Sequence, residues 1–483
     1  MSAIAPGANE PPTCHGGLEN LDDEHSYWIE DIEGDLPANL KGTFWRNGPG
    51  RQRIGGTPYG HWFDGDGMLA RFRFDGERVH FANRYVRTPK YIDETREQQI
   101  LYRGFGTQIP GGALRNLFKM PANPANTSIM YHGGQLLALN EGGHPWVVEA
   151  DSLETVGESD YAGTLARGEV FSAHGKIHQS SGHYINFGAG MSGIGWRGPK
   201  PCLNIYRIDA DGTMQRKSQV PLSSFPFAHD FALTERYAVF FIGSIVFEGM
   251  GGVMLGTKSI SDVVGFDESI PMRVVVVDLE TMEVARQFET EPGAIIHFGN
   301  AFEEGDWIYV DGMFASDFEA NATLGDVFNP NGRFNGGTYN RYQMNMVSGE
   351  LRCQRVSEHE SEFPTFDLRK AHQRHDWTYT ACAIDNGAHS FFNAIQKVSF
   401  DGDSTLVTLP PGQYGSEPMY ARATGSDREE DGYLLEVVYD AWTHRSKLQI
   451  YRCADIHAPV CVLKLPHHLP HQFHGHFVDR VFA

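Results

Sequence analysis

Four histidines follow four similar turns of the chain. Each turn is built on an aspartate between two β-prone runs, and a histidine follows it at a similar interval in all four cases. The pairs are Asp151 with His174, Asp211 with His229, Asp278 with His297, and Asp455 with His474. A lone histidine on a strand is usually an ordinary core residue. Four at the same phase of a circular repeat would face one axis, where neutral imidazoles bind Zn, Cu, Fe or Ni.

The last of these histidines lies in a histidine-rich segment, HHLPHQFHGHF at 467–477. We expect His474 alone to bind metal. His476 is the rival, because residues two apart on a strand point to the same side. His467, His468 and His471 are expected to be surface or loop residues. The segment is therefore expected to supply one ligand to a site whose other ligands lie far upstream.

The turns form a repeat that predicts the fold. Strand–turn–strand patterns with Asx, Ser, Gly or Thr at the turn, which suit hairpins, occur around Asp75, Asp151, Asp211, Asp278, Ser348, Asp401 and Asp455. A propeller blade of four strands takes about 40–50 residues plus loops. Seven blades would use the whole chain of 483 residues. Such turns are common in any β protein, so the matched histidines are what favour a propeller.

Composition supports an all-β protein and excludes several partners. The chain has 54 glycines, 25 prolines and few long helical patterns. A net charge of −21 disfavours nucleic acid. Six cysteines without a CxxC pair indicate a reducing compartment. No signal peptide is evident, and the longest apolar run, 237–247, predicts a buried strand rather than a membrane span. We expect a cytoplasmic protein.

The types of ligand limit which metal ion the site is expected to bind. Four imidazoles without a thiolate disfavour a structural zinc site. Carboxylates that accept the free ring N–H of each ligand would offset the charge of the ion. Glu141, Glu362 and Glu417 stand in apolar or Gly/Pro settings and are candidates for this task. Each of them also fits an ordinary surface or turn position.

Eight segments together resemble the carotenoid cleavage oxygenases, most closely the bacterial apocarotenoid-cleaving branch, from about residue 26 to the end. They are GTFWRNGPG (42–50), HWFDGDGM (61–68), ANTSIMYHGGQLLALNEGG (125–143), FSAHGKI (171–177), FAHDFALT (227–234), HFGNAFEE (297–304), GSEP (415–418) and FHGHF (473–477). The resemblance implies a seven-bladed β-propeller with loops and short helices as a dome over its top face. Residues 1–25 would be an N-terminal extension and 26–483 one domain, with Fe(II) on the axis.

The resemblance also implies roles for individual residues. One Fe²⁺ per chain would be held by His174, His229, His297 and His474. Glu141, Glu362 and Glu417 would orient His229, His297 and His474 respectively, which leaves His174 without a carboxylate. Thr127 would partly block an open iron position with its methyl group. The residues expected to line the substrate tunnel are Phe63, Phe227, Ile296 and Asn140.

The implied reaction is oxidative cleavage of a C=C double bond of a carotenoid or apocarotenoid by O2, giving two carbonyl products such as a retinal-type aldehyde. Stilbene-cleaving relatives usually carry a lysine where this chain has Asn140, which disfavours, without removing, a stilbene or phenylpropene substrate. A non-catalytic apocarotenoid- or lipid-binding propeller is the alternative of another class. A propeller lactonase would need carboxylate and Asn ligands instead of histidines.

A membrane-derived substrate would need an access route. In GGALRNLFKM (111–120), Leu114, Leu117 and Phe118 fall at i, i+3 and i+4, with Arg115 and Lys119 on other faces. This pattern predicts a short amphipathic helix that makes a peripheral membrane contact. A helix packed against the propeller fits the pattern equally well.

Overall fold

The computed structural model describes residues 11–195, 198–319, 324–325, 336–384 and 391–482. Within them, antiparallel strands form seven blades around one axis, with blades five and six joined into one sheet by β25. The innermost strands of neighbouring blades contact one another, as β34 contacts β8 and β30, and β22 contacts β16 and β25. The architecture is the seven-bladed propeller that the repeat and the resemblance predicted.

The strands of each blade are given from the innermost outward. Blade one contains β34 (His474–Val478), β3 (Gly42–Arg51), β6 (Asp66–Phe74), β7 (Val79–Tyr85) and β1 (Ser26–Trp28), and blade two contains β8 (Ser128–His132), β9 (Gln135–Leu139), β10 (Trp146–Val148) and β11 (Thr155–Glu158). Blade three contains β12 (Lys176–Ile177), β13 (Tyr184–Gly195), β14 (Gly198–Ile208) and β15 (Met214–Pro221), and blade four contains β16 (Ala232–Leu233), β17 (Tyr237–Ile242), β20 (Met272–Asp278) and β21 (Val284–Thr290).

Blade five contains β22 (Ala294–Glu304), β23 (Trp307–Ala315), β24 (Gly337–Asn345) and the first part of β25 (Leu351–Thr365). Blade six contains the last part of β25, β26 (Trp377–Cys382), β27 (Ala394–Ser399) and β28 (Ser404–Thr408). Blade seven contains β30 (Met419–Ala421), β31 (Tyr433–Asp440), β32 (Arg445–Arg452), β33 (Cys461–Lys464) and β2 (Ile32–Gly34). Smaller strands are β4 (Arg53–Ile54), β5 (Thr57–Pro58), β18 (Ile245–Phe247), β19 (Val264–Phe266) and β29 (Gln413–Tyr414).

The seven predicted turns occupy the same place in all seven blades. Each joins the third strand of a blade to the fourth, counted from the axis, as the Asp278 turn joins β20 to β21. Asp278 Oδ1 accepts the backbone N–H of Glu280 (3.0 Å) and Thr281 (2.9 Å), the local bonds that make Asx residues favourable at turns. After each turn the chain returns to the axis and begins the next innermost strand. The predicted repeat therefore marks the same position in every blade.

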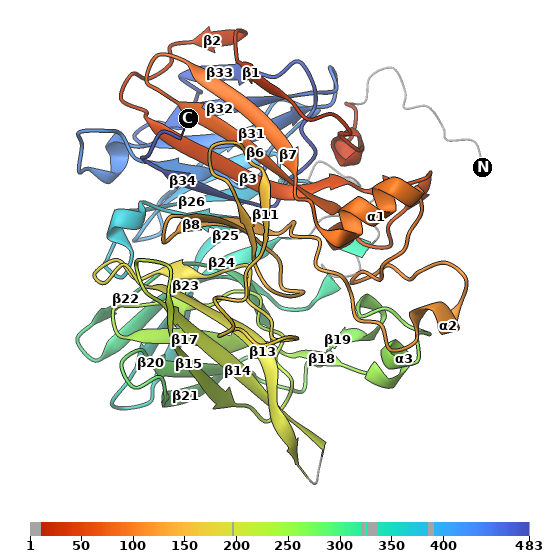
Figure 1. The fold of residues 1–483 in the computed structure, drawn as a ribbon. Helices are drawn as coiled ribbons and strands as arrows, with labels where there is room; N and C mark the ends of the chain where they lie inside the picture. The colour runs from red at the N-terminus through yellow and green to blue at the C-terminus, as the bar shows by residue number, and fades with distance from the viewer. Residues whose placement is uncertain (1–10, 196–197, 320–323, 326–335, 385–390, 483) are drawn as a thin grey trace.

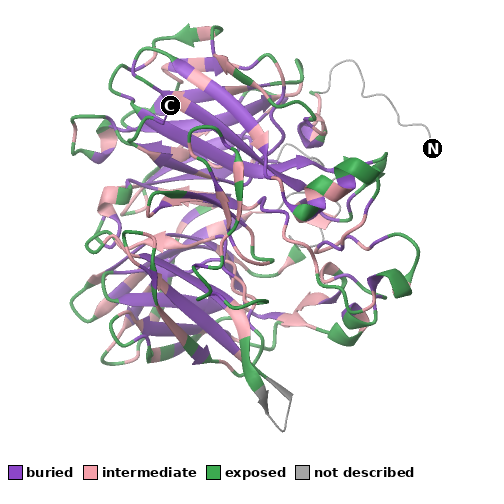
Figure 2. Ribbon diagram, viewed as in Figure 1, coloured by how far each residue is buried: buried purple, intermediate pink, exposed green. Residues whose placement is uncertain are grey.

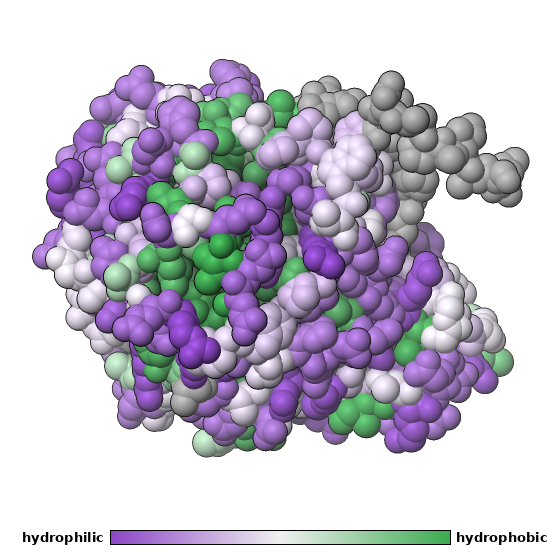
Figure 3. All heavy atoms as spheres, turned by 90° about the horizontal axis from the view of Figure 1, so that it is seen from above, coloured by the Kyte–Doolittle hydropathy of each residue, from purple (hydrophilic) through white to green (hydrophobic). Residues whose placement is uncertain are grey.

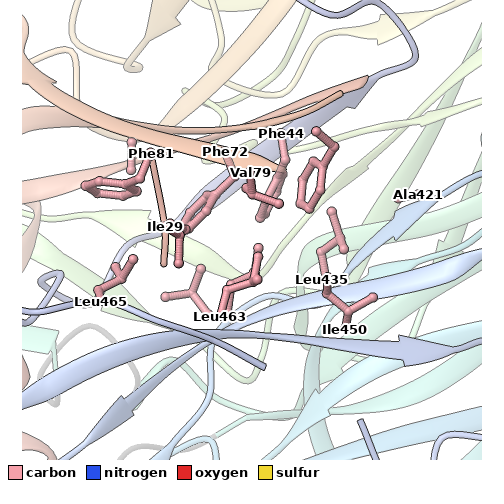
Figure 4. Close-up of a cluster of buried hydrophobic side chains, with 14 of the residues drawn as sticks. Ile29, Phe44, Phe72, Val79, Phe81, Ala421, Leu435, Ile450, Leu463 and Leu465 are labelled. Atoms are coloured by element: carbon pink, nitrogen blue, oxygen red, sulfur yellow. The ribbon is translucent and has the colours of Figure 1, made fainter. Parts of the chain in front are cut away.

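The two ends of the chain close the ring together. β34 pairs antiparallel with β3, with His474 opposite Asn47, and β2 pairs with β33 of the last blade. Figure 1 shows the N-terminal strands in red and orange beside the C-terminal strands in blue. Between them lies a buried apolar cluster that includes Phe44, Phe72, Leu435 and Leu463 (Figure 4). Burying each such side chain stabilises the closed ring by about 1.5–3 kcal/mol.

Short helices and loops lie together on one face, at the right of Figure 1. They include α1 (Pro89–Glu97), α2 (Ala113–Asn116), α3 (Met250–Met254) and the β18–β19 hairpin. Helix α1 begins with Thr88, whose side chain accepts the N–H of Tyr91, and has proline in its first turn. The 3-10 helices are η1 (Cys14–Leu18), η2 (Trp62–Asp64), η3 (Ser261–Val263), η4 (Leu368–Lys370) and η5 (Glu429–Asp431).

The amphipathic helix expected over 111–120 is shorter than predicted. It ends at Asn116, and Phe118 lies beyond it with a left-handed backbone (φ 54°). The Phe118 N–H accounts for this end, because it donates to the Met254 carbonyl oxygen (2.9 Å) instead of to a carbonyl one turn back in the helix. The buried guanidinium of Arg103 binds the backbone oxygens of Asn116 and Lys119 on either side of this point.

The prediction for the histidine-rich segment was right about loops and wrong about exposure. Residues 465–473 have no regular structure, yet His468 and His471 are only 7% and 5% exposed. The N-terminal segment covers them: His471 Nε2 lies 3.1 Å from the Cys14 carbonyl oxygen. Polar imidazoles can be buried there because each finds a hydrogen-bond partner.

Burial follows the fold, with buried strands inside and exposed loops outside (Figure 2). The apolar run at 237–247 forms the buried strand β17, as predicted, but its last residues form a second strand, β18. Viewed from above, the surface is dominated by hydrophilic residues (Figure 3), in line with the net charge of −21. In the described part of the chain, no helix combines the length and apolar character needed to cross a bilayer.

Candidate metal centre

Four innermost strands bring the four histidines together. His297 lies in β22 and His474 begins β34, whereas His174 and His229 come just before β12 and β16. One nitrogen from each ring lies within 4.8 Å of the others. His476, the rival ligand, is outside this cluster although it is buried on the same strand. The arrangement of the four is the one that the turn spacing predicted.

The other three innermost strands carry polar residues at the same level. Thr127 comes just before β8, Glu417 just before β30, and Glu362 lies in the last part of β25. Every blade therefore contributes one such side chain from its axial strand. Glu362 and Glu417 also follow the turns at Ser348 and Asp401 at a broadly similar interval, a signal in the sequence that could have selected these two glutamates.

Three glutamates lie against three of the rings. Nδ1 of His297 is 2.6 Å from Glu362 Oε2. Nδ1 of His474 is 2.9 Å from Glu417 Oε1. Nδ1 of His229 contacts Glu141 Oε1 in the same way. These are the three pairings that the resemblance implied.

The pairings determine which ring nitrogens can bind a cation. An ionised carboxylate only accepts, so each paired Nδ1 must carry the hydrogen and each Nε2 keeps a lone pair. Nε2 of His229 and Nε2 of His297 lie 3.3 Å apart, so two lone pairs face each other. Nε2 of His174 is buried and has no hydrogen-bond partner among the described residues. A cation between the rings satisfies all of them, which is how the residues present fit a metal ion.

The electrostatics keep two of these rings neutral. Burial, reinforced by the neighbouring imidazoles, holds the pKa of His174 and of His474 well below its usual range. Burial also opposes protonation of His229, but Glu141 beside it raises the pKa of that ring overall. Neutral imidazole is the form that binds a metal ion.

An aromatic cavity opens onto one side of the cluster. All four residues predicted to line the tunnel do line it, namely Phe63, Phe227, Ile296 and Asn140, as does Thr127. His229, His297 and His474 form part of the same wall. Aromatic residues that the sequence analysis missed complete it: Trp62, Phe105, Phe318, Phe363, Phe391, Phe392 and Phe473. In the sequence, only the adjacent phenylalanines at 391–392 and the HWF motif at 61–63 indicated such residues.

The amide of Asn140 is engaged within the protein. Its Nδ2 donates to Asn126 Oδ1 and to Thr127 Oγ1, both at 3.0 Å, and its Oδ1 accepts the N–H of Gly142 (2.8 Å). Asn140 therefore holds the hydroxyl of Thr127 in one orientation. It also fixes the loop that carries Glu141.

His174 differs from the other three histidines. Within the part of the chain that the structure describes, no glutamate pairs with it, as the resemblance implied. It lines a second cavity on the propeller axis together with His297 and His474, and is absent from the walls of the aromatic cavity. The four rings thus separate two cavities of different character.

Sequence comparisons place the chain among known proteins. The family model described as retinal pigment epithelial membrane protein matches residues 18–479. The apocarotenoid-15,15'-oxygenase of Synechocystis is 34% identical over 95% of this chain and 94% of its own length. A carotenoid 9,10(9',10')-cleavage dioxygenase of Pisum sativum is 29% identical over 92% of this chain and 86% of its own. A lignostilbene-alpha,beta-dioxygenase of Sphingomonas paucimobilis is 28% identical over 93% of each.

Structural comparison agrees. The crystal structure of the cobalt-substituted Synechocystis oxygenase superposes with a TM-score of 0.87 at 32% identity, covering 96% of this chain and 98% of that one. The four-histidine cluster is typical of the Fe(II) site of carotenoid cleavage oxygenases. A family model matched over almost the whole length and a relative above 30% identity lead to one conclusion: the chain belongs to the retinal pigment epithelial membrane protein family, that of the carotenoid cleavage oxygenases.

Proposed function

We propose that the protein is a non-haem Fe(II) dioxygenase that cleaves one C=C double bond of an apocarotenoid with O2, giving two carbonyl products. A retinal-type aldehyde is one expected product. The observation that carries the proposal is the cluster of four histidines at the wall of an aromatic cavity. The apocarotenoid-15,15'-oxygenase relative supports the substrate class.

In this proposal the protein holds the iron, orients the substrate and keeps water out of the site. His174, His229, His297 and His474 would hold the iron, while Glu141, Glu362 and Glu417 fix three of the rings. Bound Fe(II) supplies the electron density that activation of O2 requires. The aromatic walls exclude water and align one double bond of a rigid polyene with the centre. Both oxygen atoms end in the products, so no reductant or organic cofactor is needed.

The cavity walls favour a polyene over a phenol. Both Nδ2 hydrogens of the Asn140 amide are donated within the protein, so it offers no free donor to a phenolic oxygen, unlike a lysine at this position. Stilbene- and phenylpropene-cleaving activity is the second candidate, because lignostilbene and isoeugenol oxygenases match at 28% and 25% identity.

The test is a substrate panel with labelled oxygen. Purified protein should contain one iron per chain and convert apocarotenals faster than β-carotene or hydroxystilbenes. Under heavy-isotope O2, mass spectrometry should find label in both carbonyl products. Cleavage that continues under strict anaerobiosis would contradict the dioxygenase. Preferred turnover of stilbenes would move the protein to the second candidate, and iron or polyene binding without cleavage would make it a binding protein.

An exposed apolar patch on the dome suits a lipid surface, and we propose that it gives the protein peripheral contact with membranes. The patch, defined by Leu114, Phe118, Met120, Met254 and Leu255, includes side chains that are 87% (Leu114) and 67% (Phe118) exposed. The N–H of Phe118 donates to the Met254 carbonyl (2.9 Å), which joins its two halves. Residues 109–121 and 249–259 contain Arg115, Lys119 and Lys258 and no acidic residue, in a chain of net charge −21.

Replacing Leu114 and Phe118 with serine is expected to weaken binding to lipid vesicles at least about tenfold, because each apolar side chain that enters the interface contributes on the order of 1 kcal/mol or more. Co-sedimentation with vesicles measures this. Val156→Ser is the matched control, since Val156 is also an exposed apolar residue (61%) but lies in β11, outside the patch. Equal binding by the double variant and the control would refute the patch as the docking surface.

A further inference from the structure

Arg46 is a fully buried guanidinium behind the His474–Glu417 pair. It comes from β3 of blade one. Its Nη1 donates to Oε2 (2.9 Å) and to the backbone oxygen (3.0 Å) of Glu417, at the entry to the last blade. Its Nη2 donates to the carbonyl oxygens of Gln472 (3.3 Å) and Phe473 (3.1 Å). One side chain therefore joins the first blade, the last blade and the residues that lead into His474.

These contacts decide which oxygen of Glu417 meets His474. Oε2 is taken by Arg46 and by the N–H of Gly475 (2.6 Å). Oε1 is left for His474 Nδ1, at 2.9 Å. The plane of the carboxylate is thereby fixed, and with it the orientation of the His474 ring. Without Arg46, the carboxylate would keep one anchor instead of two.

The other two histidine–glutamate pairs have no such brace. In the described part of the chain, no arginine or lysine lies within ion-pair distance of Glu141 or Glu362. The His297–Glu362 contact is also shorter, 2.6 Å against 2.9 Å for His474–Glu417. A carboxylate that is shared with a guanidinium and an amide is a weaker acceptor for the imidazole N–H. The three pairs are therefore unequal, and the braced one belongs to the strand that closes the ring.

A second carboxyl group, Glu436 of β31, is fully buried, and neither of its oxygens bonds a described protein group. Burial raises its pKa to about 8, against the opposing effect of Arg46. The Glu417 carboxylate is therefore the ion-pair partner of Arg46, at 2.9 Å. A guanidinium buried without such a partner would be very costly.

We propose that Arg46 is a positioning residue that couples metal binding at His474 to closure of the propeller, an inference that rests on the proposed metal site. The Glu417–His474 pair is oriented for a metal only when β3, β34 and the last blade are assembled around Arg46. Metal binding in turn stabilises that assembly, because a ligand that binds only the closed form shifts the equilibrium toward it.

The test is metal binding by the full-length Arg46→Met variant. Cobalt(II) titration followed by visible absorption is expected to give a Kd about 10–100-fold weaker than wild type, the usual cost of losing a partner of a metal ligand. The rise in urea midpoint on adding cobalt(II) should shrink as well. Arg46→Lys should fall between, since the single nitrogen of an ammonium can hold Oε2 but cannot span both Glu417 and the Gln472 and Phe473 carbonyls as the two nitrogens of the guanidinium fork do.

Arg341→Met is the matched control. Arg341 is equally buried and binds Asp311 (2.7 Å) in blade five, but neither residue contacts the four histidines. The Arg341→Met variant should lose stability and keep wild-type cobalt affinity. In a double variant with Glu417→Gln, Arg46→Met should add no further loss of affinity, because Arg46 acts through Glu417.

Two results would overturn the inference: unchanged cobalt affinity in Arg46→Lys and Arg46→Met, or losses from Arg46→Met and Glu417→Gln that simply add. If Arg46→Met does not fold, Arg46→Lys carries the same comparison. A wild-type protein that binds no cobalt or iron at all would instead contradict the proposed metal site, so the two failures are distinguishable.

Discussion

Replacing His474 with alanine is expected to remove iron from the protein and reduce double-bond cleavage to background, while the propeller remains folded. The substitution leaves three neutral ligands and no group to satisfy Glu417 Oε1. Metal analysis of the purified variant should fall from one iron per chain to none. Far-UV circular dichroism should stay unchanged, because β34 still pairs with β3.

His476→Ala is the control for this prediction. His476 is buried on the same strand and on the same side, but it lies outside the cluster and its Nε2 bonds none of the described groups. It should keep its iron. The opposite outcome, iron lost in His476→Ala and kept in His474→Ala, would show that the ligand was assigned to the wrong residue.

Truncation before His474 is a harsher version of the same experiment. It should also abolish iron binding, but it removes β34 and so opens the ring. Changes at His467 and His468 should leave the iron in place. They are nevertheless expected to lower stability, because His468 is buried and His467 Nε2 lies 3.0 Å from the Tyr27 hydroxyl.

The second large effect is a loss of stability in mild acid. Burial lowers the pKa of His471 to about 4, whereas an unfolded histidine titrates near 6.5. Between these values the unfolded chain binds a proton that the folded chain does not. Stability therefore falls as the pH drops from about 6.5 to about 4, by about 3 kcal/mol for a fully buried group. Above pH 6.5 this histidine contributes no pH dependence.

The surroundings of His471 explain the direction. Burial is the main cause: the Phe391 ring lies tilted against it at 4.4 Å and Tyr439 lies edge-on at 5.5 Å. The contact of Nε2 with the Cys14 carbonyl opposes the shift, and the neighbouring imidazoles of His15 and His468 add to it. His467 shifts in the same direction, to a pKa of about 4, but its partial exposure makes its contribution smaller.

Urea midpoints at pH 7 and pH 5 measure the effect. In His471→Gln, whose amide can still donate to the Cys14 carbonyl, the loss between the two pH values should be about 2 kcal/mol smaller than in wild type. His457→Gln serves as the comparison, because His457 is an exposed turn residue. Identical pH dependence in wild type and His471→Gln would refute the explanation.

The sequence by itself determined the repeat and the ligands. Hairpin turns need Asx, Ser and Gly for local backbone reasons, so the seven turns were visible without any tertiary contact. Because each turn stands at a fixed place in its blade, the interval to the next axial strand carried the positions of His174, His229, His297 and His474. The closing strand was likewise predictable, since a ring whose last ligand lies near the C-terminus must be closed there.

The tertiary structure alone decided everything that depends on contacts between blades. The resemblance implied partners for Glu141, Glu362 and Glu417, but their local sequence fits ordinary turn carboxylates equally well, and the fold places each against one ring. The helix over 111–120 was predicted too long because the Phe118 N–H donates to the Met254 carbonyl of α3, a partner remote in sequence, instead of continuing the helix. His468 and His471 were expected outside because histidine is polar, and packing of the N-terminal segment over them reversed this. Arg46 carries no local signal at all: its role exists only where the first blade, the last blade and the closing strand meet.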